Sequence, residues 1–403
     1  MVHQTISNSS TSASKASSKI SNMDRILWCF IVGTLAACGS VAPPSPVEVG
    51  PPVLMTPGVS ADAGALPPAM PPVILQPRSR WQPVRWSELP GFDQDALHEA
   101  WNAWLKSCER PGPAFAPLCP EVRQLSIAAP EAQRAWMVRR LQPYRVEPLP
   151  GGVAEGLLTG YYEPMLDASR RPTSAHTIAL YGPPANLTPR KPWYTRQEID
   201  TLPEARAALR GREIAFLADP LDALVMQIQG SGRVRIAEPD GSQRLVRLAF
   251  AATNEHPYRS VGSWLLQQGA VRDASWSGIR AWAAQNPQRV NEMLWSNPRT
   301  VFFREEALPE FDAGFGPRGA QGVPLTPGRS IAVDKDSIPY GTPVWLVSAG
   351  PALELRRLVL AQDTGSAIVG AVRADYFTGW GPDAGEVAGR IKQPLRLWVL
   401  WPK

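Results

Sequence analysis

The sequence predicts a mainly β fold with helices, in the α+β class, and three observations lead to this expectation. From Gly322 onward, short apolar segments alternate with Gly and Pro turns, a pattern typical of a small barrel. Residues 233–236 and 244–248 flank Pro-Asp-Gly at 239–241, which is a β-hairpin signal. Apolar residues within 97–105 recur at the spacing of one helix face, so helices precede the strand-rich half.

The remaining elements follow in chain order from local signals. Pro130 opens a second helix, because proline is favoured at the first helical position. Residues 156–162 predict a strand, and Thr195-Arg-Gln-Glu198 is a capping box that opens a helix to about Arg210. Residues 214–250 are expected as strands, with the hairpin inside them. The other expected elements are helices at about 260–269, 274–285 and 287–295, and strands at 330–333, 343–347, 357–361 and 395–400.

The first 80 residues predict export. Residues 26–37 are apolar and follow Arg25, a run too short to span a bilayer and typical of a secretory signal. The run ends in Leu-Ala-Ala-Cys38-Gly39, which resembles the bacterial lipoprotein cleavage box, in which the Cys is lipidated. The alternative is a short anchor with an incidental Cys. Gly39, where an Asp would retain a lipoprotein in the inner membrane, implies an outer-membrane lipoprotein facing the periplasm.

We therefore expect a signal peptide over 1–37, or from Met23 as the true start, and then a lipidated Cys and Pro-rich linker over 38–80. Once Cys29 is removed and Cys38 is acylated, only Cys108 and Cys119 remain. In an oxidising periplasm they are expected to close a Pro-rich loop as a structural disulfide. The alternative is two separate buried thiols.

Composition and missing motifs exclude several function classes. A net charge of +5 over 403 residues argues against a dedicated nucleic-acid binder. Four scattered His do not predict a multi-histidine metal site, and we expect no cofactor, because the chain lacks a Walker loop, a dinucleotide fingerprint and a His-Glu-x-x-His motif. Most of the 15 Trp are expected in the core, while exposed Trp is suited to holding sugar rings.

Three Asp in the C-terminal part are candidates for acid–base chemistry: Asp334, Asp363 and Asp375. They lie in apolar, strand-rich surroundings, and aromatic residues follow Asp375. Partial desolvation and a nearby second carboxylate both raise the pKa of a carboxyl, as general-acid work at neutral pH requires. The alternative, from the residues alone, is that these Asp cap turns.

A series of motifs over about 155–403 carries a resemblance to a known family. The motifs are Thr159-Gly-Tyr-Tyr-Glu-Pro164, Gln229-Gly-Ser-Gly232, Tyr258-Arg-Ser-Val-Gly262, Asn297-Pro-Arg-Thr-Val-Phe-Phe303, Val323-Pro-Leu325, the three Asp segments and Gly381-Pro-Asp-Ala-Gly385. Their order resembles the membrane-bound lytic murein transglycosylase A family. Gly365-Ser366 stands where that family often has Gly-Gly, a departure that leaves the acid in place.

The resemblance implies a double-psi β-barrel with an inserted second β-barrel-like domain and a groove between them. It places the barrel, with the N-terminal helices, at 81–164 plus 309–403, and the insert at 165–308. It also implies the activity: cleavage of the β-1,4 bond between N-acetylmuramic acid (MurNAc) and N-acetylglucosamine (GlcNAc) of peptidoglycan, without water and with a 1,6-anhydro ring on MurNAc. The expected partners are glycan strands and the membrane, with wall-remodelling proteins unidentified.

By motif position, Asp375 matches the family's catalytic acid/base, and Asp363 and Asp334 match its two companions. We expect Asp363 to position sugar or tune Asp375, and Asp334 to support a turn. Expected substrate contacts are Thr159, Tyr161, Tyr162, Gln229, Ser231, Gly232, Tyr258 and Trp380. The alternatives are a tight glycine turn at Gln229 and Ser231, and a core position for Tyr258, for Trp380 and for one of the two neighbouring Tyr. Two rival interpretations are a non-catalytic peptidoglycan-binding lipoprotein and an aspartic protease, which would need a second Asp-Thr-Gly from a dimer partner.

Overall fold

The structure is a computed structural model that describes residues 70–403. The expected signal peptide, Cys38 and most of the expected linker lie outside these residues. No helix in the described part of the chain is both long enough and apolar enough to cross a membrane.

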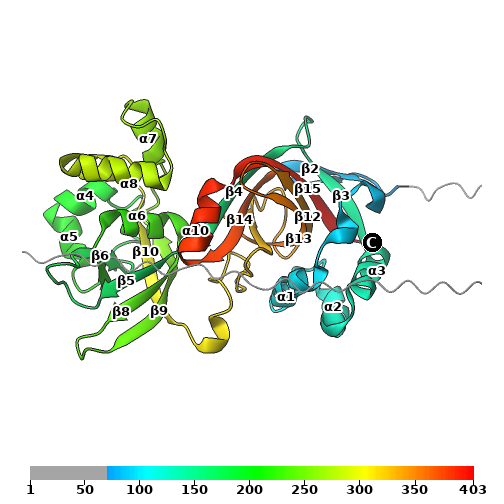
Figure 1. Ribbon diagram of the computed structural model, residues 1–403, viewed down its shortest axis with the longest axis horizontal. Helices are drawn as coiled ribbons and strands as arrows, with labels where there is room; N and C mark the ends of the chain where they lie inside the picture. Colours follow the sequence, from blue (N-terminus) through cyan, green and yellow to red (C-terminus); the bar gives the residue numbers. More distant parts are fainter. Residues whose placement is uncertain (1–69) are drawn as a thin grey trace, which may run out of the picture. The chain divides into compact units, whose positions relative to one another are not determined.

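Six strands close into a barrel (Figure 1). Their order is β15-β12-β13-β11-β14-β4, and β4 pairs back with β15 to close the ring. The pairs β11–β13 and β14–β4 are parallel. The strands are β4 (Gly156–Glu163), β11 (Ser330–Val333), β12 (Pro343–Ala349), β13 (Glu354–Asp363), β14 (Arg373–Trp380) and β15 (Lys392–Pro402). One apolar cluster takes side chains from all six strands, so the predicted barrel is confirmed.

Three further strands extend this sheet from β15: β3 (Leu141–Pro148), β2 (Ser79–Pro83) and β1 (Ile74–Leu75). The sheet therefore begins inside the segment expected as a linker to residue 80, because Ile74 and Leu75 pair with Trp81 and Arg80. An alternating burial pattern in β2, with Trp81 fully buried, explains why this Pro-flanked stretch folds as a strand.

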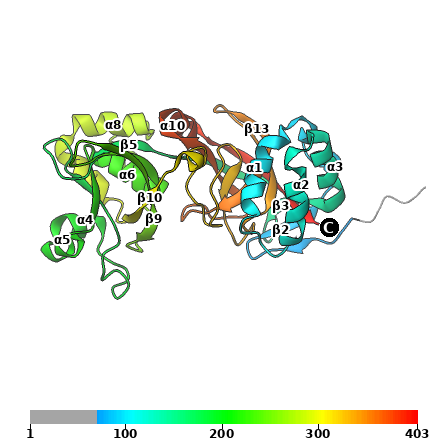
Figure 2. The same cartoon turned by 90° about the horizontal axis from the view of Figure 1, so that it is seen from below.

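Three helices pack against the outer face of the barrel (Figure 2): α1 (Leu97–Ser107), α2 (Cys119–Gln124) and α3 (Pro130–Arg140). Trp101, Trp104 and Trp136 from these helices share one core with Trp345 and Trp398 of the barrel. Many of the 15 Trp are thus core residues, as expected. Cys108 and Cys119 form a disulfide across the loop between α1 and α2.

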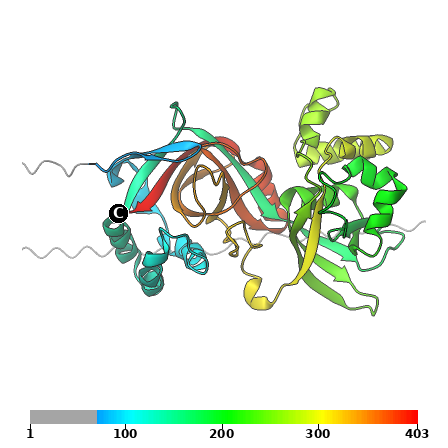
Figure 3. The same ribbon diagram turned by 180° about the vertical axis from the view of Figure 1, so that it is seen from behind.

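The insert leaves the barrel after β4 and returns before β11, and Figure 3 shows it beside the orange and red barrel strands. Its sheet has the order β10-β9-β8-β5-β7-β6. The strands are β5 (Met165–Ser169), β6 (Ile178–Tyr181), β7 (Glu213–Leu217), β8 (Gly232–Ala237), β9 (Gln243–Thr253) and β10 (Val301–Ala307). Leu180 of β6 and Phe303 of β10 lie in one core although they come from opposite sheet edges, so the sheet is curled.

Helices cover the insert sheet: α4 (Arg196–Thr201), α5 (Pro203–Leu209), α6 (Pro220–Gln229), α7 (Val261–Gln267), α8 (Trp276–Gln285) and α9 (Val290–Trp295). The barrel has one more, α10 (Gly381–Arg390), beside β4 and β14. Single 3₁₀ turns lie at Trp86–Glu88, Phe92–Gln94, Ala116–Leu118, Leu125–Ile127, Pro287–Arg289 and Glu310–Asp312. The hairpin and the three helices predicted between 260 and 295 are confirmed.

Two sequence predictions in the insert are wrong. Residues 214–250 are not all strand, because α6 interrupts them: Asp219 caps its N-terminus by accepting from the Leu221 N–H, and Gly230 ends it in the left-handed conformation with φ 82°. The helix expected from Thr195 to Arg210 is two helices. The capping box at Thr195 and Glu198 is present, but Pro203 starts a new helix after Leu202.

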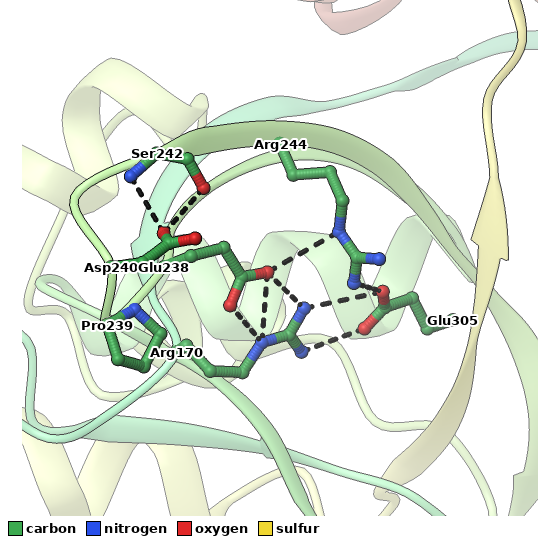
Figure 4. Close-up of a pocket in the computed structure, with 7 residues that line it drawn as sticks. All are labelled: Arg170, Glu238, Pro239, Asp240, Ser242, Arg244 and Glu305. Atoms are coloured by element: carbon green, nitrogen blue, oxygen red, sulfur yellow. Dashed lines mark hydrogen bonds and ion pairs between the residues drawn. The ribbon is translucent and has the colours of Figure 1, made fainter.

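An ion cluster ties four segments of the insert sheet together (Figure 4). Arg170, which follows β5, contacts Glu238 in the β8–β9 turn and Glu305 on β10, both at 2.8 Å. Arg244 on β9 contacts Glu238 at 3.4 Å and also bonds to Glu305. Each carboxylate thus lies between two guanidinium groups, which joins strands that are distant in sequence.

A second ion cluster fixes the point where the chain crosses between barrel and insert. Glu163, the last residue of β4, is fully buried and accepts from Arg233 Nε at 2.8 Å and Arg247 Nε at 2.5 Å. Both arginines also donate to the Phe315 carbonyl oxygen at 2.8 Å, on the returning chain. The outgoing and returning connections are therefore held by the same pair of arginines.

Candidate active site

A row of residues crosses four neighbouring strands of the barrel. Ala332 on β11 pairs with Asp363 on one side and with Asp375 on the other. Asp375 pairs in turn with Thr159 on β4. Residues paired across strands point to one face, and neighbouring strands lie about 4.8 Å apart. Asp363 and Asp375 are therefore about two strand spacings, or ~10 Å, apart at Cα on the same face of the sheet.

Asp375 keeps one carboxyl oxygen free of protein donors. Thr159 Oγ1 donates to Asp375 Oδ1 at 2.5 Å, and Arg373 Nη2 donates to Thr159 Oγ1 at 2.9 Å. No side chain or backbone N–H of residues 70–403 donates to Asp375 Oδ2. Burial raises the pKa of Asp375, and this effect exceeds the lowering by the Thr159 hydrogen bond and by the charge of Arg373.

Asp363 has donors on both carboxyl oxygens. The Tyr161 hydroxyl donates to Oδ2 at 3.0 Å, and the Ala320 backbone N–H donates to Oδ1 at 2.9 Å. Burial raises the pKa of Asp363 to about 6, the charge of Asp375 adds to this rise, and the hydrogen bonds oppose it. The Tyr161 ring packs against Phe377, with ring centroids 5.2 Å apart, which fixes the orientation of its hydroxyl.

Asp334 lies at the end of β11, and its side chain is bound by turns. Its Oδ1 accepts from the Asp336 N–H at 3.0 Å, and its Oδ2 accepts from the Gly370 N–H at 2.8 Å. Arg78 Nε lies 3.5 Å from Oδ2. The side chain is buried and lines neither of the cavities that reach the other two Asp. This geometry fits support of two turns.

A cleft lies between the barrel and the insert, made of two adjacent cavities that share Arg299, Gly365 and Ser366. The first, here called the Asp375 cavity, has a volume of about 160 Å³ and lies between Asp375 and the insert. The second, the Asp363 cavity, has a volume of about 640 Å³. Because the two cavities are adjacent, one extended ligand can reach both carboxyls.

Most of the substrate-contact residues expected from the sequence lie at this cleft. Tyr161, Tyr162, Gln229 and Ser231 line the Asp363 cavity, and Tyr258 lines the Asp375 cavity. Thr159 does not line either cavity but contacts the site by donating a hydrogen bond to Asp375. Gln229 also has a structural contact, because its Oε1 accepts from the Tyr162 backbone N–H at 3.0 Å and joins the end of α6 to β4.

Two of the expected contact residues do not line the cleft. Gly232 is buried, and a Cβ there would come within 3.2 Å of Met226, so this glycine permits close packing of β8 on α6. Trp380 lines a separate hollow on the barrel, where the Arg233 guanidinium lies 3.9 Å from its ring centroid. The cation–π contact places Trp380 at the barrel–insert crossing, away from the carboxyls.

Sequence reasoning missed the basic residues of the cleft. Arg196 and Arg299 line the Asp375 cavity together with Gln227. Arg196 is held in place by the Asn297 and Arg299 carbonyl oxygens, and burial lowers its pKa to about 10. Arg299 stands in the quoted Asn297–Phe303 motif, so the motif contained the signal, although nothing local distinguishes this Arg from one in an ordinary ion pair.

No group of three or more His, Cys, Asp or Glu side chains within residues 70–403 is placed to hold a metal ion.

Comparison with known proteins agrees with this arrangement. Residues 157–304 match the MltA specific insert domain, and residues 329–401 match the 3D domain. The membrane-bound lytic murein transglycosylase A of Vibrio cholerae is 32% identical over 269 residues, which cover 62% of this chain and 67% of that protein.

Two solved structures are also similar. The lytic transglycosylase LtgG of Burkholderia pseudomallei is 42% identical, with a TM-score of 0.56, over 80% of this chain and 95% of that one. E. coli MltA with bound chitohexaose is 25% identical, with a TM-score of 0.63, over 82% and 93%. The barrel with its insert, the cleft between them and these matches together show that the chain belongs to the membrane-bound lytic murein transglycosylase A family.

Proposed function

We propose that this lytic murein transglycosylase cleaves the β-1,4 bond between MurNAc and GlcNAc of peptidoglycan, with Asp375 as the general acid and then the general base. The observation that carries the assignment is the difference between the two cleft carboxyls. Asp363 has a donor on each oxygen, whereas nothing in residues 70–403 donates to Asp375 Oδ2, and Asp375 lines the cleft. A carboxyl with a raised pKa and one unoccupied oxygen is suited to hold a proton for a ligand.

The proposed reaction needs one carboxyl because the substrate supplies its own nucleophile. The proton on Asp375 passes to the glycosidic oxygen as the bond from that oxygen to C1 breaks. The C6 hydroxyl oxygen of MurNAc then bonds to C1, and its proton returns to Asp375. The products are a strand ending in GlcNAc and a 1,6-anhydro-MurNAc end, with no water consumed. A tethered hydroxyl has a very high effective concentration, so a second catalytic carboxylate is unnecessary.

The acidic residues that line the cleft support a mechanism with one catalytic carboxyl. Asp363 and Asp375 are the acidic residues that line the two cavities. Glycosidases that use water or a covalent intermediate need two free carboxylates. Asp363 is bound to Tyr161 and Ala320, so we assign it the role of positioning the sugar and influencing Asp375.

The proposal that the chain binds a glycan has support from a structural neighbour. E. coli MltA, a structural neighbour, has been solved with bound chitohexaose. We propose that Tyr161, Tyr162 and Tyr258 contact sugar rings, and that Ser231 and the Gln229 amide bond to hydroxyl or N-acetyl groups. A sugar-stacking role for Trp380 is not part of this proposal.

Mass spectrometry of the muropeptides released from purified sacculi tests the reaction. The expected products are one water lighter than those released by lysozyme. Products with a reducing MurNAc end would mean hydrolysis and overturn the proposal. Sedimentation with sacculi without release of any soluble product would favour the alternative, a peptidoglycan-binding lipoprotein.

We also propose that the chain is anchored by lipid on Cys38 and faces the periplasm from the outer membrane. The cleavage-box resemblance and the membrane-bound relatives support this location. Metabolic labelling with a fatty acid should label the wild-type protein and not Cys38→Ala. Equal labelling of both proteins, or recovery of Cys38→Ala in the same outer-membrane fraction as the wild type, would count against it.

A further inference from the structure

We infer that Arg110 and Arg318 form a carboxylate-binding subsite at the Asp363 cavity, and that it takes the acidic groups on the side chain of MurNAc. The inference deepens the proposed function and rests on it for the identity of the substrate. Both residues line the cavity. Neither lies within the segments matched by the two family domains, 157–304 and 329–401.

The two guanidinium groups converge on one glycine. Arg318 Nη1 donates to the Gly322 carbonyl oxygen at 3.1 Å. A Cβ added to Gly322 would lie 2.7 Å from Arg110 Nη1, so the absence of a side chain is what lets Arg110 lie against this loop. Gly322 also has φ +84°, a backbone conformation that other residues rarely adopt. The loop thus brings two cations from distant parts of the chain to one place.

The backbone around both arginines is well fixed. Arg110 follows the disulfide-bonded Cys108, and Gln321 Nε2 donates to the Arg110 carbonyl oxygen at 3.1 Å. Arg318 lies in a turn closed by a bridge to Pro324. The two side chains are exposed, but the backbone that carries them is constrained. A disulfide and a side-chain hydrogen bond hold the backbone at Arg110, and a β-bridge holds it at Arg318.

Arg110 and Arg318 bring two positive charges to this cavity without a nearby counter-ion in the described part of the chain. Neither Arg110 nor Arg318 has a carboxylate within 4.0 Å among residues 70–403, whereas nearby Arg304 is paired with Glu306 at 2.7 Å. The one acidic residue lining the cavity is Asp363, whose two oxygens already accept hydrogen bonds. Two adjacent guanidinium groups without a counter-ion favour an anion that bridges them.

The chemistry of the proposed substrate indicates which anion would bind to Arg110 and Arg318. The sugar rings of the glycan are uncharged, and its acidic groups are carboxylates on the MurNAc side chain. One source is the lactyl carboxylate of strands without peptides, and the other is the carboxylates of the stem peptide. Guanidinium groups recognise both sources by the same paired hydrogen bonds, so the experiment has to separate them.

The experiment compares binding of three probes to full-length protein carrying Asp375→Asn, which prevents turnover. The probes are neutral chitohexaose, strands whose peptides have been removed by an amidase, and peptide-bearing strands. In this background, Arg110→Gln/Arg318→Gln is expected to weaken binding of an acidic probe about tenfold and to leave chitohexaose within about twofold. The difference should shrink at high salt, because exposed charges are screened. Arg139→Gln, an exposed charge change on α3, is the matched control.

The outcomes separate the sources and the proposals. A loss confined to peptide-bearing strands assigns the site to stem-peptide carboxylates, and a loss confined to amidase-treated strands assigns it to the lactyl carboxylate. An equal loss with both acidic probes means that the site takes either carboxylate. An equal loss with chitohexaose, or no loss with any probe, overturns the subsite. The proposed function is judged separately, by the products of the protein with Asp375 intact, so its failure would appear as hydrolysis or no release, whatever the arginine variants do.

Discussion

The carboxylates of the barrel cleft and those of the insert ion cluster have opposite surroundings. Glu238 in the insert lies between Arg170 and Arg244, and its hydrogen bond with Arg170 lowers its pKa. In the cleft, Asp363 and Asp375 bond to hydroxyl or backbone donors and form no ion pair within residues 70–403, and burial raises the pKa of both. Direct guanidinium contact favours the charged form of Glu238, and the absence of such contact lets the cleft carboxyls hold a proton nearer to neutral pH.

Burial alone does not explain why the cleft carboxyls differ from carboxylates that form ion pairs. Glu163 at the barrel–insert crossing is fully buried, yet it contacts Arg233 and Arg247 directly. The partners of a buried carboxyl therefore decide whether it holds the fold together or is available for proton transfer. Four predictions test this comparison.

The largest effect is expected from Asp375→Asn, which removes the proposed acid with little change in shape. Release of anhydro products from sacculi should fall by about 10³-fold or more, since general acid–base groups contribute about 10²–10⁴-fold. The measurement is the initial rate of muropeptide release, with circular dichroism to show that the fold is retained. Asp363→Asn is the matched comparison and should retain more activity. Near-wild-type turnover of Asp375→Asn would reject the assignment.

The second-largest effect, a loss of stability, is expected from Glu163→Ala at the barrel–insert crossing. The change leaves Arg233 and Arg247 buried without their shared carboxylate, so the free energy of unfolding should fall by about 3–5 kcal/mol. Urea denaturation measures it. A loss below about 1 kcal/mol would show that the arginines find other partners and that this cluster does not fix the crossing.

Asp363→Asn should remove a pH dependence of stability. With a folded pKa of about 6 against a usual 3.8, native Asp363 binds more protons than the unfolded chain between these values. The stabilisation linked to the protonated Asp363 carboxyl is therefore complete below about pH 4. The free energy of unfolding then falls by about 3 kcal/mol as pH rises through about 6. The variant should gain stability relative to wild type at about pH 7.5 and not at about pH 4. Thermal unfolding at both pH values measures the difference, and a constant difference would contradict the raised pKa.

Glu238→Gln should show the opposite sign and the smallest effect. The lowered pKa of Glu238 means that its ion pairs stabilise the fold above its usual pKa and lose this effect as pH falls. The variant should be less stable by about 0.5–1 kcal/mol at neutral pH, with the deficit disappearing in acid as pH falls through the lowered pKa of Glu238. Thermal unfolding of both proteins across pH tests it, and a deficit that persisted in acid would mean that packing, rather than charge, accounts for the loss.

Much of the fold could be predicted where the signal is local. The hairpin around Asp240, the capping box at Thr195 and the apolar face of α1 each depend on a few neighbouring residues. The strand prediction over α6 was wrong although Asp219, Pro220 and Gly230 are residue types that mark the start and end of a helix. The position of Trp380 could not be predicted, since nothing local indicates that Arg233 lies on its ring.

By itself, the sequence determined the barrel strands, the hairpin, most of the helices and which carboxyls are candidates, because helix caps, turns and apolar periodicity act over a few residues. Only the tertiary structure decided which carboxyl keeps a free oxygen, that Tyr161 reaches Asp363 and that Arg110 and Arg318 both lie against Gly322. These contacts join residues that are up to about 200 positions apart, and they depend on strand register and barrel closure. A pKa follows from such contacts, so it is a property of the folded arrangement rather than of any short motif.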